Sequence, residues 1–303
     1  MNTTFAQTSA PSLEQWRLMR QANVEQALAS WVPPEAPAEL GTAMRYAVLD
    51  GGKRLRPLLV LATSEALGGL ASAALRAACA VELIHAYSLV HDDMPCMDND
   101  VLRRGKPTVH VRYGQAQALL AGDALQALAF ELLTPDDGSM PPAMAARLCR
   151  LLARAAGAHG MAGGQAIDLA SVGLSLDQPA LEGMHRLKTG ALLQASVMMG
   201  AATADADAHQ ASCLADFGAS IGLAFQVVDD ILDVTADSQT LGKTAGKDAA
   251  ADKPTFVSLM GLAAAQTYAD EVLDRAHAAL DRSGLSQTGY LRGLADWVGR
   301  RSH

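Results

Sequence analysis

The chain has 303 residues, of which 50% are hydrophobic, 18% are charged and only 4% are aromatic. Its formal net charge is −8, which argues against the basic surface that nucleic-acid binding requires. The apolar residues are mostly alanine and leucine, so the composition favours helices over strands. The cysteines form no CxxC pair, and neither a zinc site nor a disulfide framework is predicted.

The first residues, MNTTFAQTSAPSLEQWRLMR, contain no basic start followed by an apolar stretch, so no signal peptide is predicted. The polar residues 1–11 are expected to be disordered. No uninterrupted run of about eighteen apolar residues occurs, and we therefore expect no stable membrane insertion. These features predict a cytoplasmic protein.

The sequence pattern is helical from Ser12 onward. Ser12 and Gln15 have the spacing of a capping box, which predicts a helix start. Long and largely apolar helices are predicted over residues 71–90 and 211–232. We find neither strand alternation nor a linker long enough to separate domains. Residues 1–303 are therefore expected to form one all-α domain, a helical bundle.

The stretch SLVHDDMPCMDND, residues 88–100, ends the first of these helices with a group of aspartates. Asp92 and Asp98 are six positions apart and cannot share a face of a regular helix. Pro95 has no backbone N–H to donate to the carbonyl of His91, so the helix must bend or break there. Asp98 can then fold back toward Asp92. Carboxylates held this close together predict a divalent cation with oxygen ligands, most simply Mg²⁺.

A second helix ends in a similar way, in GLAFQVVDDILDV. Asp229 and Asp233 are one turn apart and lie on one helix face together with Gln226. A solvated acidic helix end is an alternative explanation, but the apolar flanking sequence disfavours it. Two helices of a bundle can bring both acidic ends face to face. With phosphate oxygens completing the shells, they would hold several Mg²⁺ ions around a diphosphate.

Basic residues lie near the acidic ends in sequence and suit an anionic ligand. Two segments supply most of them: Lys53, Arg54 and Arg56 in GGKRLRP, and Arg103, Arg104 and Lys106 in LRRGKPT. Arginine is suited to bidentate contact with phosphate oxygens. His85 lies two turns before Asp92 on the same helix face, although an isolated helical histidine is more often structural.

Several segments occur in the order found in trans-isoprenyl diphosphate synthases: GGKRLRP, HDDMPCMD, LRRGKPT, GQAIDL, HRLKTGAL, GLAFQVVDDILDV and LGKTAGKD. They extend from about residue 45 to 255, and together they resemble that family. AVELIHAYSLVHDD and the spacing of the first aspartate motif are most similar to bacterial short-chain farnesyl diphosphate synthases. The resemblance implies an all-α bundle around a deep apolar cavity, and a homodimer.

The resemblance also implies an activity. Enzymes of that family join an allylic diphosphate to isopentenyl diphosphate and release pyrophosphate. For this chain we expect a transferase of isoprenoid biosynthesis, a farnesyl diphosphate synthase, that extends dimethylallyl or geranyl diphosphate with several Mg²⁺ ions per active site. A dry apolar pocket fits this chemistry, because water would quench the allylic cation.

Residue roles follow from the resemblance only where the motifs match. Six carboxylates are expected to bind Mg²⁺: Asp92, Asp93, Asp98, Asp229, Asp230 and Asp233. The allylic diphosphate is expected to contact four basic residues: Arg103, Lys188, Lys243 and Lys253. Isopentenyl diphosphate is expected to contact four others: Lys53, Arg56, His85 and Arg104. Thr189 and Gln226 are expected to direct dipoles toward the developing cation. The expected catalytic set therefore has these members: Asp92, Asp93, Asp98, Lys188, Thr189, Gln226 and Asp229.

In this family the bulk of the residue about five positions before the first aspartate limits growth of the product. Tyr87 holds that position here, with Ser88 beside it, which favours the fifteen-carbon product. An ordinary core tyrosine, with geranyl or geranylgeranyl diphosphate as product, is the alternative. A terpene cyclase would not need GGKRLRP, and a non-catalytic partner subunit that binds prenyl diphosphates would not need both complete aspartate motifs.

Overall fold

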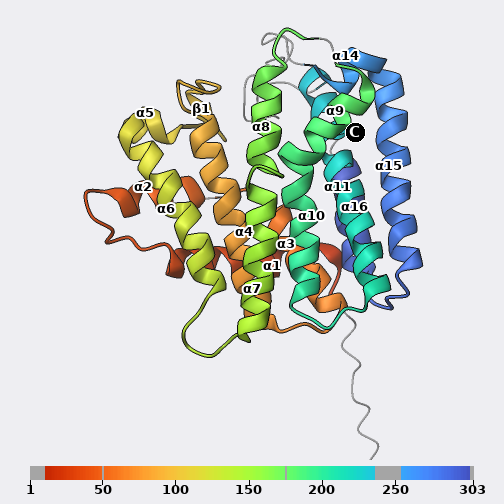
Figure 1. The fold of residues 1–303 in the computed structure, drawn as a ribbon, viewed down its shortest axis with the longest axis horizontal. Helices are drawn as coiled ribbons and strands as arrows, with labels where there is room; N and C mark the ends of the chain where they lie inside the picture. The colour runs from red at the N-terminus through yellow and green to blue at the C-terminus, as the bar shows by residue number, and fades with distance from the viewer. Residues whose placement is uncertain (1–10, 50, 175, 236–253, 301–303) are drawn as a thin grey trace, which may run out of the picture.

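The computed structural model describes residues 11–49, 51–174, 176–235 and 254–300, and these residues are mostly helical (Figure 1). The all-α prediction is therefore confirmed. Almost all of the segment expected to be disordered, 1–11, and the expected ligands Lys243 and Lys253 lie outside the described residues.

The helices of the described residues have these bounds: α1 (Leu13–Trp31), α2 (Leu40–Val48), α3 (Leu55–Ala66), α4 (Ala71–Asp92), α5 (Val109–Tyr113), α6 (Gln115–Leu133), α7 (Pro142–Ala156), α8 (Met161–Ala170), α9 (Gln178–His185), the π-helical turn η1 (Arg186–Gly190), α10 (Ala191–Ala202), α11 (Ala208–Thr235), α14 (Phe256–Met260), α15 (Leu262–Arg282) and α16 (Gly289–Gly299). A small antiparallel hairpin, β1 (Leu102–Arg103) and β2 (Lys106–Pro107), lies between α4 and α5. Its strands are too short to give a sequence pattern, and it was not predicted.

Side-chain caps explain where two of the helices begin. The Ser12 hydroxyl accepts from the Gln15 amide (3.3 Å), and the Gln15 side chain accepts from the Ser12 amide (3.1 Å), which confirms the capping box. At α9, the Asp177 side chain accepts from the Ala180 amide (2.9 Å). These side chains satisfy N–H groups that the first turn of a helix leaves without partners.

The core lies along α3, α4, α10 and α11, which pass close to one another in Figure 1. α4 packs on α3 and α6, and α10 packs on α3 and α11. Near the site, Gly222 of α11 lies against Gly190 of η1, where a Cβ at position 222 would lie 2.6 Å from the Gly190 Cα. Only glycine permits this approach, which brings the chain before α10 against the middle of α11.

By length and composition alone, α4, α6 and α11 could each cross a membrane. None of the three was predicted as a membrane span, because polar residues interrupt the apolar sequence of each helix. Within the most apolar window of each helix, the buried share is 67% for α4, 39% for α6 and 50% for α11. Among the three, α6 thus leaves the most of its apolar window outside the bundle, including Leu119 and Leu120.

Candidate active site

A cavity of about 760 Å³ lies among α4, α8, η1 and α11. Its wall contains most of the predicted site residues that the structure describes: Arg56, His85, Tyr87, Ser88, Asp92, Asp98, Arg103, Lys188, Thr189, Gln226, Asp229 and Asp230. Four other predicted residues are described but do not line it: Lys53, Asp93, Arg104 and Asp233. The two acidic helix ends therefore face a common space, as the sequence predicts.

α4 ends at Asp92, and the chain then turns back on itself around Pro95. The Asp98 amide donates to the Asp92 carbonyl (2.9 Å), and both side chains line the cavity, which confirms the effect predicted for Pro95. Burial, together with the neighbouring Asp98 carboxylate, raises the pKa of Asp92 to about 6 despite the opposing charge of Lys188. A bound cation would relieve both effects.

Asp93 makes a different set of contacts. It is buried, and its Oδ1 accepts from Nε (2.8 Å) and Nη2 (2.5 Å) of Arg103, while its Oδ2 accepts from Nε at 2.9 Å. Arg103 belongs to β1 and itself lines the cavity. The Asp93 carboxylate thus orients a basic side chain of the site. Its expected role as a metal ligand stays a prediction.

Gln226 is held in place by two hydrogen bonds. The Thr189 hydroxyl donates to Gln226 Oε1 (3.1 Å), and Gln226 Nε2 donates to Asp230 Oδ1 (2.8 Å). Because the Thr189 hydroxyl donates its proton to Gln226, its oxygen can offer only lone pairs to the cavity that it lines. Both residues can therefore direct the negative ends of fixed dipoles toward a positive charge.

Two further aspartates near the end of α11 are buried, with Asp230 2% exposed and Asp233 4% exposed. Oδ2 of Asp230 accepts from the amide of Phe256 (2.8 Å), the first residue of α14, so this carboxylate ties α14 to α11. Oδ1 of Asp233 has no hydrogen-bond partner in the part of the chain that the structure describes. That either residue binds a metal ion stays a prediction.

Three cavity residues were not identified from the sequence. Asp168 of α8 is buried and forms an ion pair with Lys188 (2.6 Å). Among the described residues, neither the Gln165 amide nor the His185 ring has a hydrogen-bond partner. Burial, helped by the charge of Lys188, lowers the pKa of His185 to about 4, so the ring is neutral. The polar residues within GQAIDL and HRLKTGAL were the signal that could have identified all three.

The predicted isopentenyl diphosphate residues form a positively charged region. Arg56 lines the cavity, and burial lowers its pKa to about 10. Its Nε has no hydrogen-bond partner among the described residues. Burial, reinforced by the charges of Arg56 and Arg104, holds the pKa of His85 well below its ordinary value. His85 is therefore neutral, and it lies beside cations that would gain from an anionic ligand.

Arg54 is an exception among the basic residues of GGKRLRP. Its guanidinium is buried and forms ion pairs with Glu25 and Glu82, both at 2.6 Å. The interpretation of Arg54 as a cation available to phosphate was therefore wrong. Both partners lie in helices far away in the sequence, and only the folded chain brings them together.

The described residues contain no cluster of three or more His, Cys, Asp or Glu side chains that could hold a metal ion. The carboxylates of Asp92, Asp98 and Asp229 nevertheless line the same cavity. Mg²⁺ usually takes one or two carboxylates and completes its shell with water and phosphate oxygens. This donor set therefore fits Mg²⁺ that binds together with a diphosphate better than a preformed metal cage.

Tyr87 and Ser88 line the cavity near the end of α4. The Tyr87 ring packs edge-on against the ring of His91, with centroids 5.6 Å apart. Nε2 of His91 lies 3.1 Å from the Leu119 carbonyl oxygen of α6, and Gly122 makes room for it, since a Cβ there would lie 2.1 Å from Nε2. The tyrosine is thus supported through His91 by a neighbouring helix.

Known proteins are similar to this chain over most of its length. A farnesyl diphosphate synthase from Geobacillus stearothermophilus is 48% identical over 257 residues, covering 84% of this chain and 86% of that protein. Geranylgeranyl pyrophosphate synthase 7, chloroplastic, from Arabidopsis thaliana is 46% identical over 283 residues, covering 92% and 81%. The crystal structure of a geranyltransferase from Helicobacter pylori, complexed with magnesium and isoprenyl diphosphate, has a TM-score of 0.86 at 33% identity, covering 97% of this chain and 99% of that one.

A family model described as Polyprenyl synthetase matches residues 37–284, a span that includes every predicted site residue. The similar proteins include both farnesyl and geranylgeranyl diphosphate synthases, so they agree on prenyl transfer without selecting one product. The resemblance found in the sequence motifs is confirmed. The chain belongs to the polyprenyl synthetase family of prenyltransferases.

Proposed function

We propose that the chain joins isopentenyl diphosphate to dimethylallyl or geranyl diphosphate and forms farnesyl diphosphate. The observation that carries the proposal is the cavity wall, where Asp92, Asp98 and Asp229 occur together with Arg103 and Lys188. Carboxylates and cations on one wall suit a diphosphate that arrives with Mg²⁺. The Helicobacter pylori protein, solved with magnesium and isoprenyl diphosphate, supports the same ligand chemistry.

The first step is departure of pyrophosphate from the allylic substrate, with the electron pair of the breaking C–O bond. The three cavity carboxylates would hold Mg²⁺, which when bound neutralises charge on the leaving group. Arg103 and Lys188 add positive charge, and a buried carboxylate orients each of them: Asp93 for Arg103 and Asp168 for Lys188. Such preorganised charges lower the barrier without rearranging during the reaction. Further contacts from Lys243 and Lys253 stay predictions.

The second step is attack of the double bond of isopentenyl diphosphate on the allylic cation, followed by transfer of a proton to the pyrophosphate released in the first step. Thr189 and Gln226 stabilise the cation through oxygen lone pairs whose orientation their mutual hydrogen bond fixes. Apolar wall residues such as Leu89 and Phe225 help to keep water away from the cation.

Isopentenyl diphosphate would bind through Lys53, Arg56, His85 and Arg104. Arg56 and His85 line the cavity, and the other two come from the segments that adjoin it. The neutral His85 ring adds a hydrogen bond to this group without adding a further positive charge. The site thus concentrates like charges that a diphosphate would neutralise.

The position of Tyr87 supports a fifteen-carbon product. Its ring lies in the cavity wall and is supported by His91, so a growing chain cannot push it aside without disturbing α6. Geranyl or geranylgeranyl diphosphate would arise from the same chemistry with a different stopping point. Similar proteins named as geranylgeranyl synthases keep that alternative open.

A product assay tests the proposal. Purified protein is incubated with Mg²⁺, isopentenyl diphosphate and dimethylallyl diphosphate, and the dephosphorylated alcohols are separated by chain length. Farnesol as the main product supports both the chemistry and the role of Tyr87. Geraniol or geranylgeraniol would retain the chemistry and reject the tyrosine argument. No elongation with either allylic starter would indicate a non-catalytic partner subunit instead.

We also propose that the chain forms a homodimer through α5 and α6. Val111, Leu119 and Leu120 are 49%, 47% and 53% exposed, and together they offer an apolar surface to a second copy. Light scattering tests this directly, and a monomer at micromolar concentration would contradict it. A single domain over residues 1–303 and a cytoplasmic location stay predictions.

A further inference from the structure

Arg54 occupies an unfavourable backbone conformation just before α3. Its φ of 50° and ψ of 32° lie in the left-handed region. For a residue with a Cβ, this conformation is sterically strained. Its side chain is only 1% exposed, whereas the neighbouring Lys53 is exposed. Tertiary contacts must therefore hold Arg54 in place.

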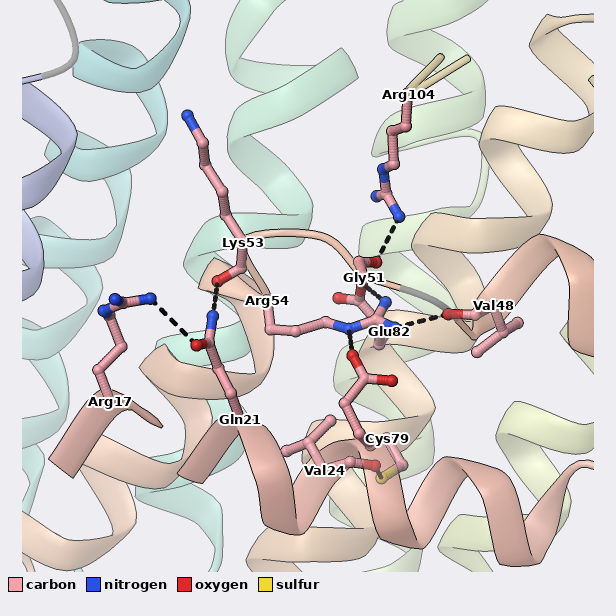
Figure 2. Close-up of polar contacts among 11 residues, drawn as sticks. Arg17, Gln21, Val24, Val48, Gly51, Lys53, Arg54, Cys79, Glu82 and Arg104 are labelled. Atoms are coloured by element: carbon pink, nitrogen blue, oxygen red, sulfur yellow. Dashed lines mark hydrogen bonds and ion pairs between the residues drawn. The ribbon is translucent and has the colours of Figure 1, made fainter. Parts of the chain in front are cut away.

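Three helices bind the guanidinium of Arg54. Nε contacts Glu25 of α1, Nη1 contacts Glu82 of α4, and Nη2 donates to the Val48 carbonyl of α2, each at 2.6 Å. Figure 2 shows the Arg54 side chain directed toward Glu82 and the Val48 carbonyl, while Lys53 extends away from it. Burial alone would lower the pKa of Arg54, but the two carboxylates outweigh it and keep the side chain charged. Each guanidinium nitrogen of Arg54 thus has a hydrogen-bond partner within the protein.

The backbone before Arg54 is held from α1 as well. Nε2 of Gln21 donates to the Lys53 carbonyl (2.9 Å), and Arg17 in turn donates to Gln21 Oε1 (3.0 Å), as drawn in Figure 2. The peptide that carries Lys53 therefore has a partner independent of its own side chain. α1 thus positions both Lys53 and Arg54.

On the other side, the loop is joined to the segment after β1. Nη1 of Arg104 donates to the Gly51 carbonyl (2.6 Å), which Figure 2 also shows. Gly52 has a φ of 124°, and a Cβ there would lie 2.9 Å from Nη1 of Arg104. Glycine therefore allows the Arg104 guanidinium to lie directly on the loop. The two segments assigned to isopentenyl diphosphate are thereby linked to each other.

The charges of this network favour a concentrated positive site above it. Glu25 and Glu82 carry two negative charges and Arg54 carries one positive charge, which leaves a net −1 beneath the loop. Burial lowers the pKa values of Arg56 and Arg104, and the Glu82 carboxylate opposes that effect at both. The network therefore supports the arrangement of the cations as well as the backbone between them.

We propose that Arg54 is a positioning residue for isopentenyl diphosphate: by binding α1, α2 and α4 at once, it fixes the loop of residues 51–54 and so the placement of Lys53 and Arg56. The inference rests on the proposed function, because that function assigns this loop to isopentenyl diphosphate. The allylic diphosphate would meet the carboxylates and Lys188, which this network does not touch.

Steady-state kinetics test the proposal with Arg54→Lys, which keeps the charge but cannot reproduce three directed contacts. The KM for isopentenyl diphosphate is expected to rise about tenfold or more, and that for the allylic diphosphate to change less than about twofold. Arg76→Lys is the matched control. Arg76 also pairs with a carboxylate, Asp137 (3.0 Å), and belongs to α4, but it does not line the cavity. Both KM values of the control should match those of the wild type.

Glu25→Ala provides a milder test in case Arg54→Lys does not fold. The Glu25 side chain is 34% exposed, and its removal leaves Glu82 and Val48 bound to Arg54. A smaller but selective rise in the KM for isopentenyl diphosphate is expected. Unchanged KM values in a folded variant, even with a lower melting temperature, or an equal rise for both substrates, would overturn the proposal. A wild-type protein that makes no prenyl product would instead refute the proposed function.

Discussion

At the end of α4 the chain leaves the helix after Asp92, whereas α11 continues past Asp229 to Thr235. The third aspartate of each motif therefore lies in a different position relative to the cavity. Asp98 returns to the cavity through the turn at Pro95, while Asp233 remains on its helix and is buried away from the cavity. Two similar sequence patterns thus give one acidic end with a folded-back carboxylate and one without.

The second aspartate of the adjacent pair has a similar structural role at the end of α4 and at the end of α11. Asp93 orients Arg103, and Asp230 binds the amide of Phe256. Successive residues are rotated by about 100° around a helix, so two adjacent aspartates cannot point in the same direction. In each pair, the first aspartate thus lines the cavity, and the second binds a residue of a later segment of the chain.

The largest expected effect is on the first aspartates. Asp92→Asn and Asp229→Asn should each lower the condensation rate by about 10³-fold, because each removes a charge that is proposed to hold Mg²⁺ on the leaving group. Initial rates at saturating substrate and Mg²⁺ measure this. If either variant kept full activity, its helix end would not serve the chemistry.

Asp92→Asn should also stabilise the metal-free protein. Its folded pKa of about 6 lies above the unfolded value, so its contribution to stability is present in full at low pH and is lost as the pH rises through 6. At pH 8 the neutral side chain should raise the free energy of unfolding by about 1–2 kcal/mol. Urea titration without Mg²⁺ measures it, and a less stable variant would contradict the electrostatic cause.

The second aspartates should affect stability more than chemistry. Asp93→Ala leaves the Arg103 guanidinium without its main partner, and Asp230→Ala leaves the buried Phe256 amide without one. Each loss is expected to cost about 2–3 kcal/mol of unfolding free energy. Asp230→Asn, which keeps an acceptor oxygen, should cost less. Wild-type stability with activity as low as that of Asp92→Asn would instead identify these carboxylates as metal ligands.

His185 makes a smaller and pH-dependent difference on the α11 side, where its ring packs on Phe256. Its folded pKa of about 4 lies below the unfolded value of about 6.5, so stability is lost as the pH falls between these values. The loss should reach about 2 kcal/mol by pH 5. Comparing the wild type with His185→Gln isolates it from the opposing titration of Asp92. Parallel stability profiles would show that the ring is not buried as a neutral group.

The smallest expected effect on rate is at Tyr87, on the α4 side. Tyr87→Ala should leave the condensation rate within about threefold and shift the product toward longer chains, because the ring no longer blocks the cavity. Tyr87→Phe is the control, since it keeps the aromatic ring and removes only the hydroxyl, so its products should match those of the wild type. An unchanged product distribution in Tyr87→Ala would make the tyrosine an ordinary packing residue.

Local features of the fold and site could be predicted from the sequence. The capping box at Ser12 depends on residues three positions apart, and the return of Asp98 depends on Pro95 close by. The meeting of both acidic ends at a common cavity also followed from their repetition at the ends of long apolar helices. In each case the cause lies within the segment or in the helix period.

The different contacts that neighbouring residues of one motif make could not be predicted in the same way. Arg54 and Arg56 look equivalent in GGKRLRP, yet one is paired in the interior and the other lines the cavity. The difference depends on Glu25 and Glu82, which are 29 and 28 positions away from Arg54. Asp93 likewise depends on the hairpin that carries Arg103. Long-range partners decide these roles, and a single sequence does not identify them.

α1 lies outside residues 37–284, the span that the family model matches. It nevertheless supplies Glu25 and Gln21 to the loop that contains Arg54. A protein trimmed to the matched span would keep every residue of the cavity wall and lose the contacts that hold the loop proposed to bind isopentenyl diphosphate. For protein engineering, the smallest working unit of this chain is therefore longer than the segment that defines its family.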